Sequence, residues 1–326
     1  MTQSITNLAI MGMGRWGAQL VEAVQGKSQT VQFTNVVSRN AERVRADADR
    51  LSLKVSADLD AVLFDSEIDG VVLATPHSTH EEQIIACARA GKPVFVEKPF
   101  TLTRASAERA LAEASPDLVV AVGHNRRFLP SAVDLKGMLD EGRLGRILYV
   151  ETNFSGNVAS AYEDDHWRVR GGESPAGGLA GAGIHMIDLI IHLCAPVRSV
   201  YAESWRQALD IQMDDTTWAT FKLEDGAGAS LTTLMATAPT FRLQVFGTNG
   251  TAELRGESCL ALTDQSGKRE VRDYDPVDTR RTQLEAFGAA IRGESSATIS
   301  RDDILNGVAA FEAVGLSVER GERVDI

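Results

Sequence analysis

Glu97-Lys98-Pro99 carries the side chain with the clearest chemical potential in this sequence. The triplet follows Pro93-Val94-Phe95-Val96, an apolar run typical of a buried parallel strand. Ligands gather at the carboxyl ends of strands in an open α/β sheet, so the Lys98 ammonium is placed for proton transfer or charge stabilisation. Pro99 favours extended backbone at Lys98, which limits where the ammonium points. The competing interpretation is a solvated lysine that closes a turn.

A glycine-rich turn near the start of the chain predicts a partner for that lysine. The apolar run 7–11 leads into Gly12-Met13-Gly14-Arg15-Trp16-Gly17, and a helical pattern of Leu20, Val21 and Val24 follows. In such a strand, turn and helix the first glycine makes the tight turn and the second lets backbone N–H groups approach a pyrophosphate. The third allows the helix to pack closely on the strand. The turn therefore predicts a dinucleotide site at the helix N-terminus.

Length, charge and cysteine content limit the other possibilities. The 326 residues suggest two domains, and a net charge of −12 without a basic cluster argues against a nucleic-acid partner. Residues 1–6 lack the features of a leader peptide, and no apolar run approaches a membrane span of about 20 residues, so cytoplasm is the expected compartment. Three scattered cysteines have no metal-site spacing, so no metal is expected.

The first third of the chain alternates strand-like and helical patterns. The expected strands are 33–38, 71–75, 94–96 and 118–122, and the expected helix 78–90 has Ser78 and Thr79 as N-cap candidates. This alternation is typical of an α/β, doubly wound parallel sheet, and we assign it to a Rossmann domain over residues 1–123.

The remainder, residues 124–326, has a different pattern. From Gly145 onward the segments are longer and richer in strand-forming residues. Turns at 224–226 and 248–250 indicate antiparallel pairing. Two helical patterns, around 284–291 and 304–318, close the chain, and these late helices could pack back on the first domain. This pattern predicts a second, α+β domain.

Three blocks, in this order and spacing, make the whole chain resemble the Gfo/Idh/MocA family of nicotinamide-dependent oxidoreductases. They are the glycine turn, the Glu97-Lys98-Pro99 triplet with the preceding Thr75-Pro76-His77 and His80, and the segment from Gly177 to Asp188. The resemblance implies a Rossmann domain, a second domain with a large, open, mostly antiparallel sheet that serves substrate binding and often mediates oligomers, and hydride transfer between NAD(P) and a sugar or polyol carbon. A homodimer or homotetramer is the implied assembly.

The resemblance also implies two catalytic residues. Lys98 matches the family lysine that lies between the nicotinamide and the reacting oxygen, and His185 matches a histidine that hydrogen-bonds this oxygen. On its own pattern, His185 is better interpreted as a core histidine of an apolar helix, and the family match favours the catalytic role. The family usually has an aspartate four residues earlier, and this chain has Gly181 there. Asp164, Asp165, His166 and Asp188 are candidate substitutes.

The end of the second expected strand bears on the form of the cofactor. NAD enzymes typically place a carboxylate there for the ribose 2′-hydroxyl, whereas this chain has Ser38 and Arg39. A hydroxyl and a guanidinium can bind a 2′-phosphate, so NADP(H) is preferred and NAD(H) remains possible. The alternative is that Arg39 is a solvated residue at the start of a helix.

The other candidate site residues are assigned by the resemblance. Thr75, Pro76, His77, His80 and Glu97 are expected beside the cofactor. Asn125, Arg127, Trp167 and Arg168 are expected to contact the substrate, with stacking by Trp167 and hydrogen bonds from Arg168. Structural alternatives are packing for the Trp-Arg pair, ion pairing for Arg127, and capping or orienting of the helix for His80.

The sequence thus predicts an NADP-preferring oxidoreductase that acts on a small sugar or polyol. Two alternatives stay open. The first is a sugar sensor that binds the cofactor without turnover, which the glycine at position 181 suggests. The second is an NAD-dependent glycosidase, which would show no net change in nicotinamide absorbance.

Overall fold

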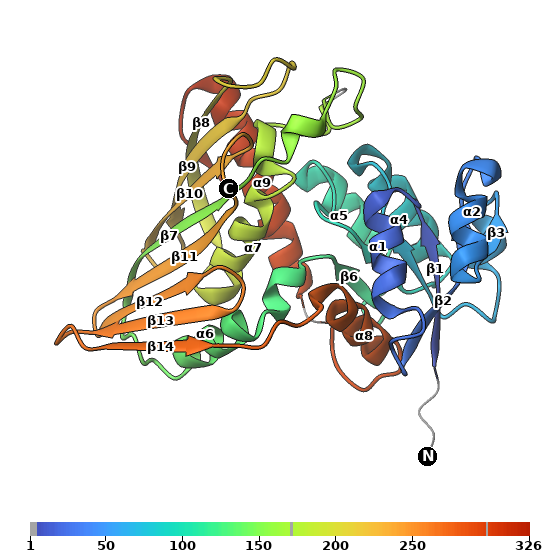
Figure 1. Ribbon diagram of the computed structural model, residues 1–326, viewed down its shortest axis with the longest axis horizontal. Helices are drawn as coiled ribbons and strands as arrows, with labels where there is room; N and C mark the ends of the chain where they lie inside the picture. The colour runs from blue at the N-terminus through green and yellow to red at the C-terminus, as the bar shows by residue number, and fades with distance from the viewer. Residues whose placement is uncertain (1–4, 170–171, 298) are drawn as a thin grey trace. The chain divides into compact units, whose positions relative to one another are not determined.

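The computed structural model describes residues 5–169, 172–297 and 299–326, which form two compact units (Figure 1). Residues 1–4 lie outside the described part, so the expectation about a leader there stays a prediction. Unit 1 comprises residues 1–101, 105–125 and 278–304, and unit 2 comprises 102–104, 126–277 and 305–326. The chain therefore returns to unit 1 late, with the helix that begins at Thr279.

Unit 1 is built on a parallel sheet with the order β3-β2-β1-β4-β5-β6. This order confirms the predicted doubly wound α/β fold. The order reverses between β1 and β4, and this is where such sheets bind ligands. The strands are β1 (Thr6–Met11), β2 (Val31–Val37), β3 (Lys54–Ser56), β4 (Gly70–Leu73), β5 (Val94–Val96) and β6 (Val120–Val122).

Helices cover both faces of this sheet. On one face α1 buries Leu20, Val21 and Val24 against the strands, and α8 adds Phe287, whose ring lies 5.8 Å from that of Phe95. Helix α4 packs against β4 and β5, and the right-handed connections usual in parallel sheets predict that α4 and α5 lie on the other face. The helices are α1 (Arg15–Val24), α2 (Ala41–Leu51), α3 (Asp60–Leu63), α4 (His80–Arg89), α5 (Arg104–Ala112) and α8 (Thr279–Ile291), with 3-10 turns η1 (His77–Thr79) and η2 (Asn125–Phe128).

The start of α4 differs from the prediction. The helix begins at His80, after the η1 turn, and the Thr79 side chain makes no capping hydrogen bond. Its hydroxyl donates instead to the Pro76 carbonyl over 2.8 Å, which stabilises the turn that precedes the helix. Thr79 does occupy the predicted N-cap position, but its backbone is helical (φ −96°, ψ −7°) rather than extended, and its hydroxyl oxygen accepts no N–H of the first turn.

Unit 2 contains a sheet with the order β14-β13-β12-β11-β7-β10-β9-β8-β15. Its pairs are antiparallel except β7 with β10, which confirms the predicted mostly antiparallel sheet. Both predicted turns form, between β9 and β10 and between β11 and β12. The strands are β7 (Ile147–Ser155), β8 (Val197–Trp205), β9 (Thr216–Leu223), β10 (Gly228–Leu234), β11 (Thr240–Gly247), β12 (Gly250–Arg255), β13 (Cys259–Asp264), β14 (Arg269–Asp273) and β15 (Val324–Asp325).

One face of this second sheet carries the hydrophobic core of unit 2. Alternate residues such as Val150, Leu231 and Leu243 pack against helices on that side, as Figure 1 shows for the layer beside the sheet. These helices are α6 (Pro130–Asp140), α7 (Gly183–Leu193) and α9 (Arg301–Arg320), with 3-10 turns η3 (Ala159–Ala161) and η4 (Gly177–Leu179). None of the described helices is long and apolar enough to cross a membrane.

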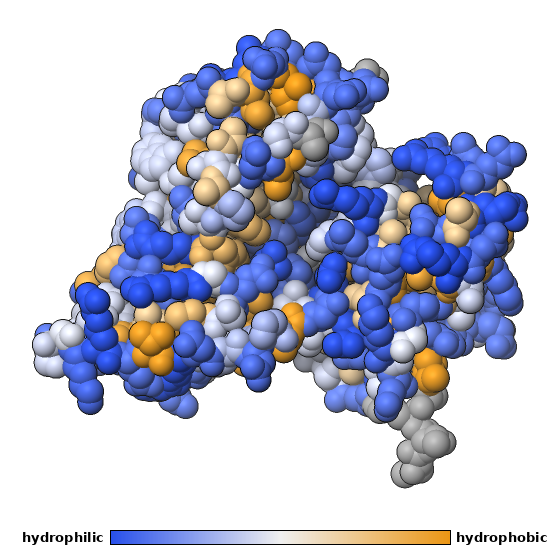
Figure 2. All heavy atoms as spheres, in the orientation of Figure 1, coloured by the Kyte–Doolittle hydropathy of each residue, from blue (hydrophilic) through white to orange (hydrophobic). Residues whose placement is uncertain are grey.

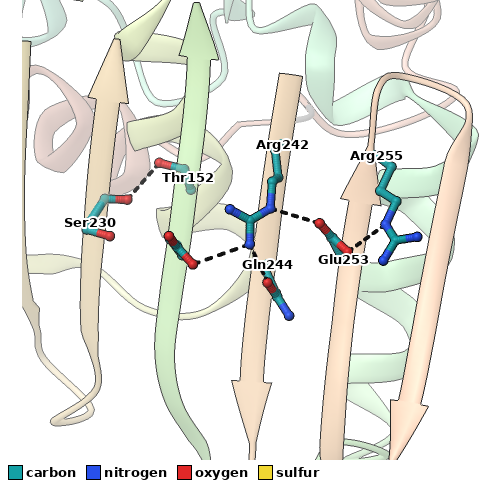
Figure 3. Close-up of polar contacts among 7 residues, drawn as sticks. Thr152, Ser230, Arg242, Gln244, Glu253 and Arg255 are labelled. Atoms are coloured by element: carbon teal, nitrogen blue, oxygen red, sulfur yellow. Dashed lines mark hydrogen bonds and ion pairs between the residues drawn. The ribbon is translucent and has the colours of Figure 1, made fainter. Parts of the chain in front are cut away.

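The opposite face of the sheet is polar at its centre (Figure 3). Arg242 of β11 donates to Glu253 of β12 over 2.8 Å and lies 3.4 Å from the Glu151 carboxylate of β7. Arg255 completes the row with a 2.6 Å bond to Glu253. Figure 2 shows hydrophobic residues in small, separate patches on the side of unit 2 that it displays.

Candidate active site

The glycine turn lies where the strand order of unit 1 reverses. A Cβ atom on Gly12 would lie 2.4 Å from the Ala74 carbonyl oxygen after β4, and Gly12 has a φ of +97°. A Cβ on Gly17 would lie 2.0 Å from the Gly12 carbonyl oxygen. Two backbone segments therefore touch at positions where only glycine fits.

The same turn fits a dinucleotide. A Cβ atom on Gly14 would meet nothing within 4 Å, so the backbone is open to close approach at this point. Gly14 is also the N-cap of α1; it offers no side-chain cap, and the first turn carries no acidic residue. The first N–H groups of α1 are thus available to an anion, which the helix dipole favours. Trp16, the second residue of α1, is half-buried against the unit 1 core.

Lys98 lies directly beyond β5, on the same edge of the sheet. The Glu97 N–H donates to the Leu73 carbonyl over 2.9 Å, so parallel pairing with β4 continues to the residue before the lysine. Glu97 is buried, and its carboxylate packs where a Gly123 Cβ would be, 2.7 Å away. Lys98 is half-buried and is followed by a cis peptide bond to Pro99. The bond from Glu97 to β4 therefore holds the lysine at the strand end.

Side chains of α4 hold the loop after β4 in place. The Thr75 hydroxyl donates to Gln83 Oε1 over 2.6 Å, and His80 Nε2 lies 3.1 Å from the Thr75 carbonyl oxygen. His77 is buried, with its ring 5.9 Å from that of His80. Our sequence reasoning missed Gln83. A polar residue beside Ile84 on the buried face of a helix was the available signal.

The predicted 2′-phosphate residues lie at the end of β2. The Ser38 hydroxyl donates to the Asn40 carbonyl over 3.0 Å, so it shapes the loop that leads into α2. Asn40 then caps α2 by accepting the Arg43 N–H over 3.1 Å. Arg39 between them is exposed. Of the two predicted contacts, Arg39 presents a charged group to solvent, while the Ser38 hydroxyl already has a local partner.

In unit 2, His185 belongs to α7, a helix that is buried almost all round. The His185 side chain is buried and its ring lies 5.9 Å from the Phe154 ring of β7. Asp188 and His192 follow at spacings of three and seven residues, which places all three on one face of the helix. An otherwise hydrophobic helix thus carries a strip of three titratable side chains along one face.

Arg127 neutralises the acidic member of this strip. Its Nε and Nη2 atoms donate to the Asp188 carboxylate over 2.8 to 3.1 Å, and Nη1 lies 3.3 Å from His192 Nδ1. Both side chains of the ion pair are about 5% exposed. The structure therefore places Arg127 in a buried ion pair of unit 2. Asn125, two residues before Arg127, is also buried, and its side-chain amide donates to the Thr279 hydroxyl of α8 within unit 1.

The remaining predicted substrate residues lie in the segment before α7. Trp167 is 36% exposed, and the Arg168 guanidinium lies 4.4 Å from the centre of its ring. The two side chains thus form a cation–π pair with each other. Asp164 and Asp165 nearby are exposed.

Gly181 is exposed, and a Cβ atom there would meet only the Gly178 carbonyl oxygen, at 3.7 Å. The space around position 181 would therefore accommodate the aspartate that the resemblance leads us to expect.

Thiol and metal chemistry find little support. Burial raises the pKa of Cys87 and of Cys194 to about 12, so neither thiol is poised as a nucleophile. Within residues 5–169, 172–297 and 299–326, histidine, cysteine and acidic side chains form no group that could hold a metal ion.

A glycine turn at a topological switch point, open to an anion, defines a dinucleotide-binding α/β protein. Comparison with known families identifies it further. Residues 6–124 match the model of an oxidoreductase family with an NAD-binding Rossmann fold, and residues 133–253 match the Gfo/Idh/MocA C-terminal domain. The chain belongs to the Gfo/Idh/MocA family of oxidoreductases, which confirms the sequence-based assignment.

Its relatives include inositol dehydrogenases. The chain is 28% identical over 300 residues to inositol 2-dehydrogenase 2 of Saccharopolyspora erythraea, a match that covers 87% of this chain and 84% of that protein. It is 37% identical over 147 residues to the NAD⁺-dependent scyllo-inositol 2-dehydrogenase of Bacillus subtilis, where the match covers 43% and 42%. This second match spans less than half the length of either protein.

Solved structures share the fold across both units. A putative NADPH-dependent oxidoreductase from Desulfitobacterium hafniense superposes with a TM-score of 0.91 at 24% identity, covering 99% of this chain and 98% of that one. Levoglucosan dehydrogenase in complex with NADH and levoglucosan gives a TM-score of 0.88 at 20% identity, covering 99% and 100%. At these identities the similarity establishes the fold.

Replacing Arg127 by methionine leaves the Asp188 carboxylate buried without its charged partner. We expect Arg127→Met to lower the free energy of unfolding by about 3–5 kcal/mol, because a lone buried charge is costly. The double variant Arg127→Met/Asp188→Leu removes both charges and should recover most of that loss. Urea denaturation measures the difference.

Arg323→Met is the matched control, since its ion pair with Asp325 is 63% and 77% exposed. Its cost should stay below about 1 kcal/mol. Equal losses for the two single variants would contradict a structural role for the buried pair.

Proposed function

We propose that this protein transfers a hydride between NADP(H) and a carbon of a small sugar or polyol, with Lys98 and His185 managing the proton on the substrate oxygen. The observation that carries the proposal is the fixed position of Lys98. Backbone pairing holds the residue before it beside the end of β4, on the sheet edge that also bears the glycine turn. The inositol and levoglucosan dehydrogenases among the similar proteins support the substrate class.

The bound cofactor supplies the hydride donor or acceptor, and the chain supplies the rest. The first N–H groups of α1 and the Gly14 backbone would hold its pyrophosphate. The Lys98 ammonium stabilises negative charge on the reacting oxygen and passes a proton to or from it. His185 assists, because an imidazole exchanges protons near neutral pH. Asp188 is already neutralised by Arg127, so it serves the site by orienting α7.

Lys98→Ala should lower kcat by about 10²–10⁴-fold while cofactor affinity stays nearly unchanged, since a general acid–base group acts on the chemical step. His185→Ala should lower kcat by a smaller factor. Turnover of a panel of sugars and polyols, read by nicotinamide absorbance, measures both effects, and Lys54→Ala, an exposed lysine on β3, is the control.

Unchanged activity in Lys98→Ala would refute the mechanism. Cofactor binding without turnover of any panel member would favour the sensor, and cleavage of a glycoside without a net absorbance change would favour the glycosidase.

The preference for NADP(H) rests on the exposed guanidinium of Arg39 beside the N-terminus of α2. Arg39→Asp should raise the KM for NADPH about 10–100-fold, the loss expected for a charge-assisted hydrogen bond worth about 1.5–3 kcal/mol. The KM for NADH should change little. Arg45→Asp, an exposed residue farther along α2, is the control. A wild-type KM lower for NADH than for NADPH would overturn the preference.

The polar face of the unit 2 sheet supports a homodimer or homotetramer. Charges of alternating sign, Glu151, Arg242, Glu253 and Arg255, form a row across three strands (Figure 3). Such a row is complementary to itself when a two-fold axis turns a second copy onto it. Exposed aromatic residues, among them Tyr149 at 38%, add apolar area on the same face.

Light scattering on a sizing column should give at least twice the chain mass of 35.1 kDa. Glu253→Lys should shift the protein toward the monomer, because it leaves two arginines facing a third cation. Glu319→Lys, an exposed residue near the end of α9, should leave the mass unchanged. A wild-type monomer would exclude this assembly.

A further inference from the structure

The His80 ring connects the loop after β4 to the turn that follows Lys98. His80 is the first residue of α4 and is completely buried. Its Nδ1 atom lies 2.9 Å from the Pro99 carbonyl oxygen and 3.3 Å from that of Phe100. Its Nε2 atom lies 3.1 Å from the Thr75 carbonyl oxygen. Both ring nitrogens therefore face backbone oxygens, which only accept hydrogen bonds.

This arrangement determines how many protons the ring carries. A neutral imidazole has one N–H and one lone pair, so it can donate to only one side. The other nitrogen would then turn a lone pair toward a carbonyl oxygen, in a buried place where water cannot relieve the repulsion. An imidazolium donates to both sides through charge-assisted bonds.

Opposing effects act on the same ring. Burial and the positive N-terminus of α4 disfavour a cation there. Glu81 and Glu82 in the first turn counter the helix dipole, and the His77 ring faces His80 edge-on at 5.9 Å. Three backbone carbonyl oxygens lie within 3.3 Å of the two ring nitrogens, and we take their effect as decisive.

The consequence concerns the backbone on both sides of Lys98. Before it, the Glu97 N–H is bonded to Leu73 of β4. After it, the Pro99 carbonyl oxygen is in hydrogen-bond contact with His80 Nδ1. Thr75 is likewise held at its carbonyl by His80 and at its hydroxyl by Gln83. One buried ring thus fixes the distance between two loops at the carboxyl edge of the sheet.

We propose that His80 is a positioning residue which, as an imidazolium, holds Lys98 and Thr75 in fixed relation to each other. The inference rests on the proposed catalytic role of Lys98. It gives His80 a task different from the cofactor contact suggested by the sequence.

Two substitutions separate the halves of this link. The amide of His80→Asn can replace the Nδ1 donor toward Pro99, whereas that of His80→Gln can replace the Nε2 donor toward Thr75. The hydrogen bond to the Pro99 carbonyl is adjacent to Lys98, and His80→Gln loses it whereas His80→Asn keeps it. We therefore expect kcat to fall about 100-fold in His80→Gln and only about tenfold in His80→Asn, in line with the cost of a misplaced reacting group. The Kd for NADPH, followed by nicotinamide fluorescence, should change little in both.

Ile84→Val is the matched control, since Ile84 is equally buried one turn farther along α4 and touches neither loop through a polar atom. It should lower the thermal midpoint without lowering kcat. If kcat in the two His80 variants follows the thermal midpoint as it does in Ile84→Val, the positioning role is wrong.

A spectroscopic test on the wild-type protein needs no turnover. With ¹⁵N-labelled histidine, the His80 signals are those lost in His80→Asn. At pH 8, above the ordinary histidine pKa of about 6.5, both ring nitrogens should still carry protons. A single neutral tautomer at that pH would overturn the inference. If no sugar or polyol is turned over, the proposed function fails, and the ¹⁵N result still decides the state of His80.

Discussion

The close approach of the Gly12 turn to the end of β4 is the constraint on which unit 1 depends. A Cβ atom at Gly12 would lie 2.4 Å from the Ala74 carbonyl oxygen, so the two strand ends meet as bare backbone. This contact fixes the glycine turn, the Thr75 loop and, through β4 pairing with β5, the position of Lys98. Chemical groups from three distant parts of the sequence thereby share one edge of the sheet.

In unit 2 the main constraint is different, because α7 places polar side chains inside a hydrophobic core. His185, Asp188 and His192 share one face of a helix whose other residues are almost all buried and apolar. A carboxylate in that setting needs a partner, and Arg127 from η2 supplies three hydrogen bonds. A buried ion pair adds little net stability, but it defines the rotation of α7 because Asp188 has to meet Arg127. The orientation of His185 follows from that rotation.

Local patterns in the sequence predicted the elements well and their connections less well. Apolar runs located β2, β4, β5 and β6 within about two residues, and glycine-containing turns identified two hairpins of the second sheet. Thr79 is the N-cap residue of α4 as predicted, but its helical backbone leaves its side chain without a capping bond. The Arg127 ion pair and the His80 contacts join residues 61 and 19 positions apart, and no periodicity encodes such pairings. The sequence thus identified candidate groups, and only the fold showed which of them already have partners.

This distinction bears on the aspartate expected at position 181. Gly181 has open space around it, so packing did not remove the carboxylate. Asp188 is bound to Arg127 and is a poor substitute, because releasing it would leave a guanidinium alone in the core. Asp164 and Asp165 are exposed, outside the buried environment that holds Asp188. These aspartates are therefore weaker candidates, and the proposed mechanism assigns the proton to Lys98 and His185. Its main requirement is then that the backbone at both residues is held precisely in place.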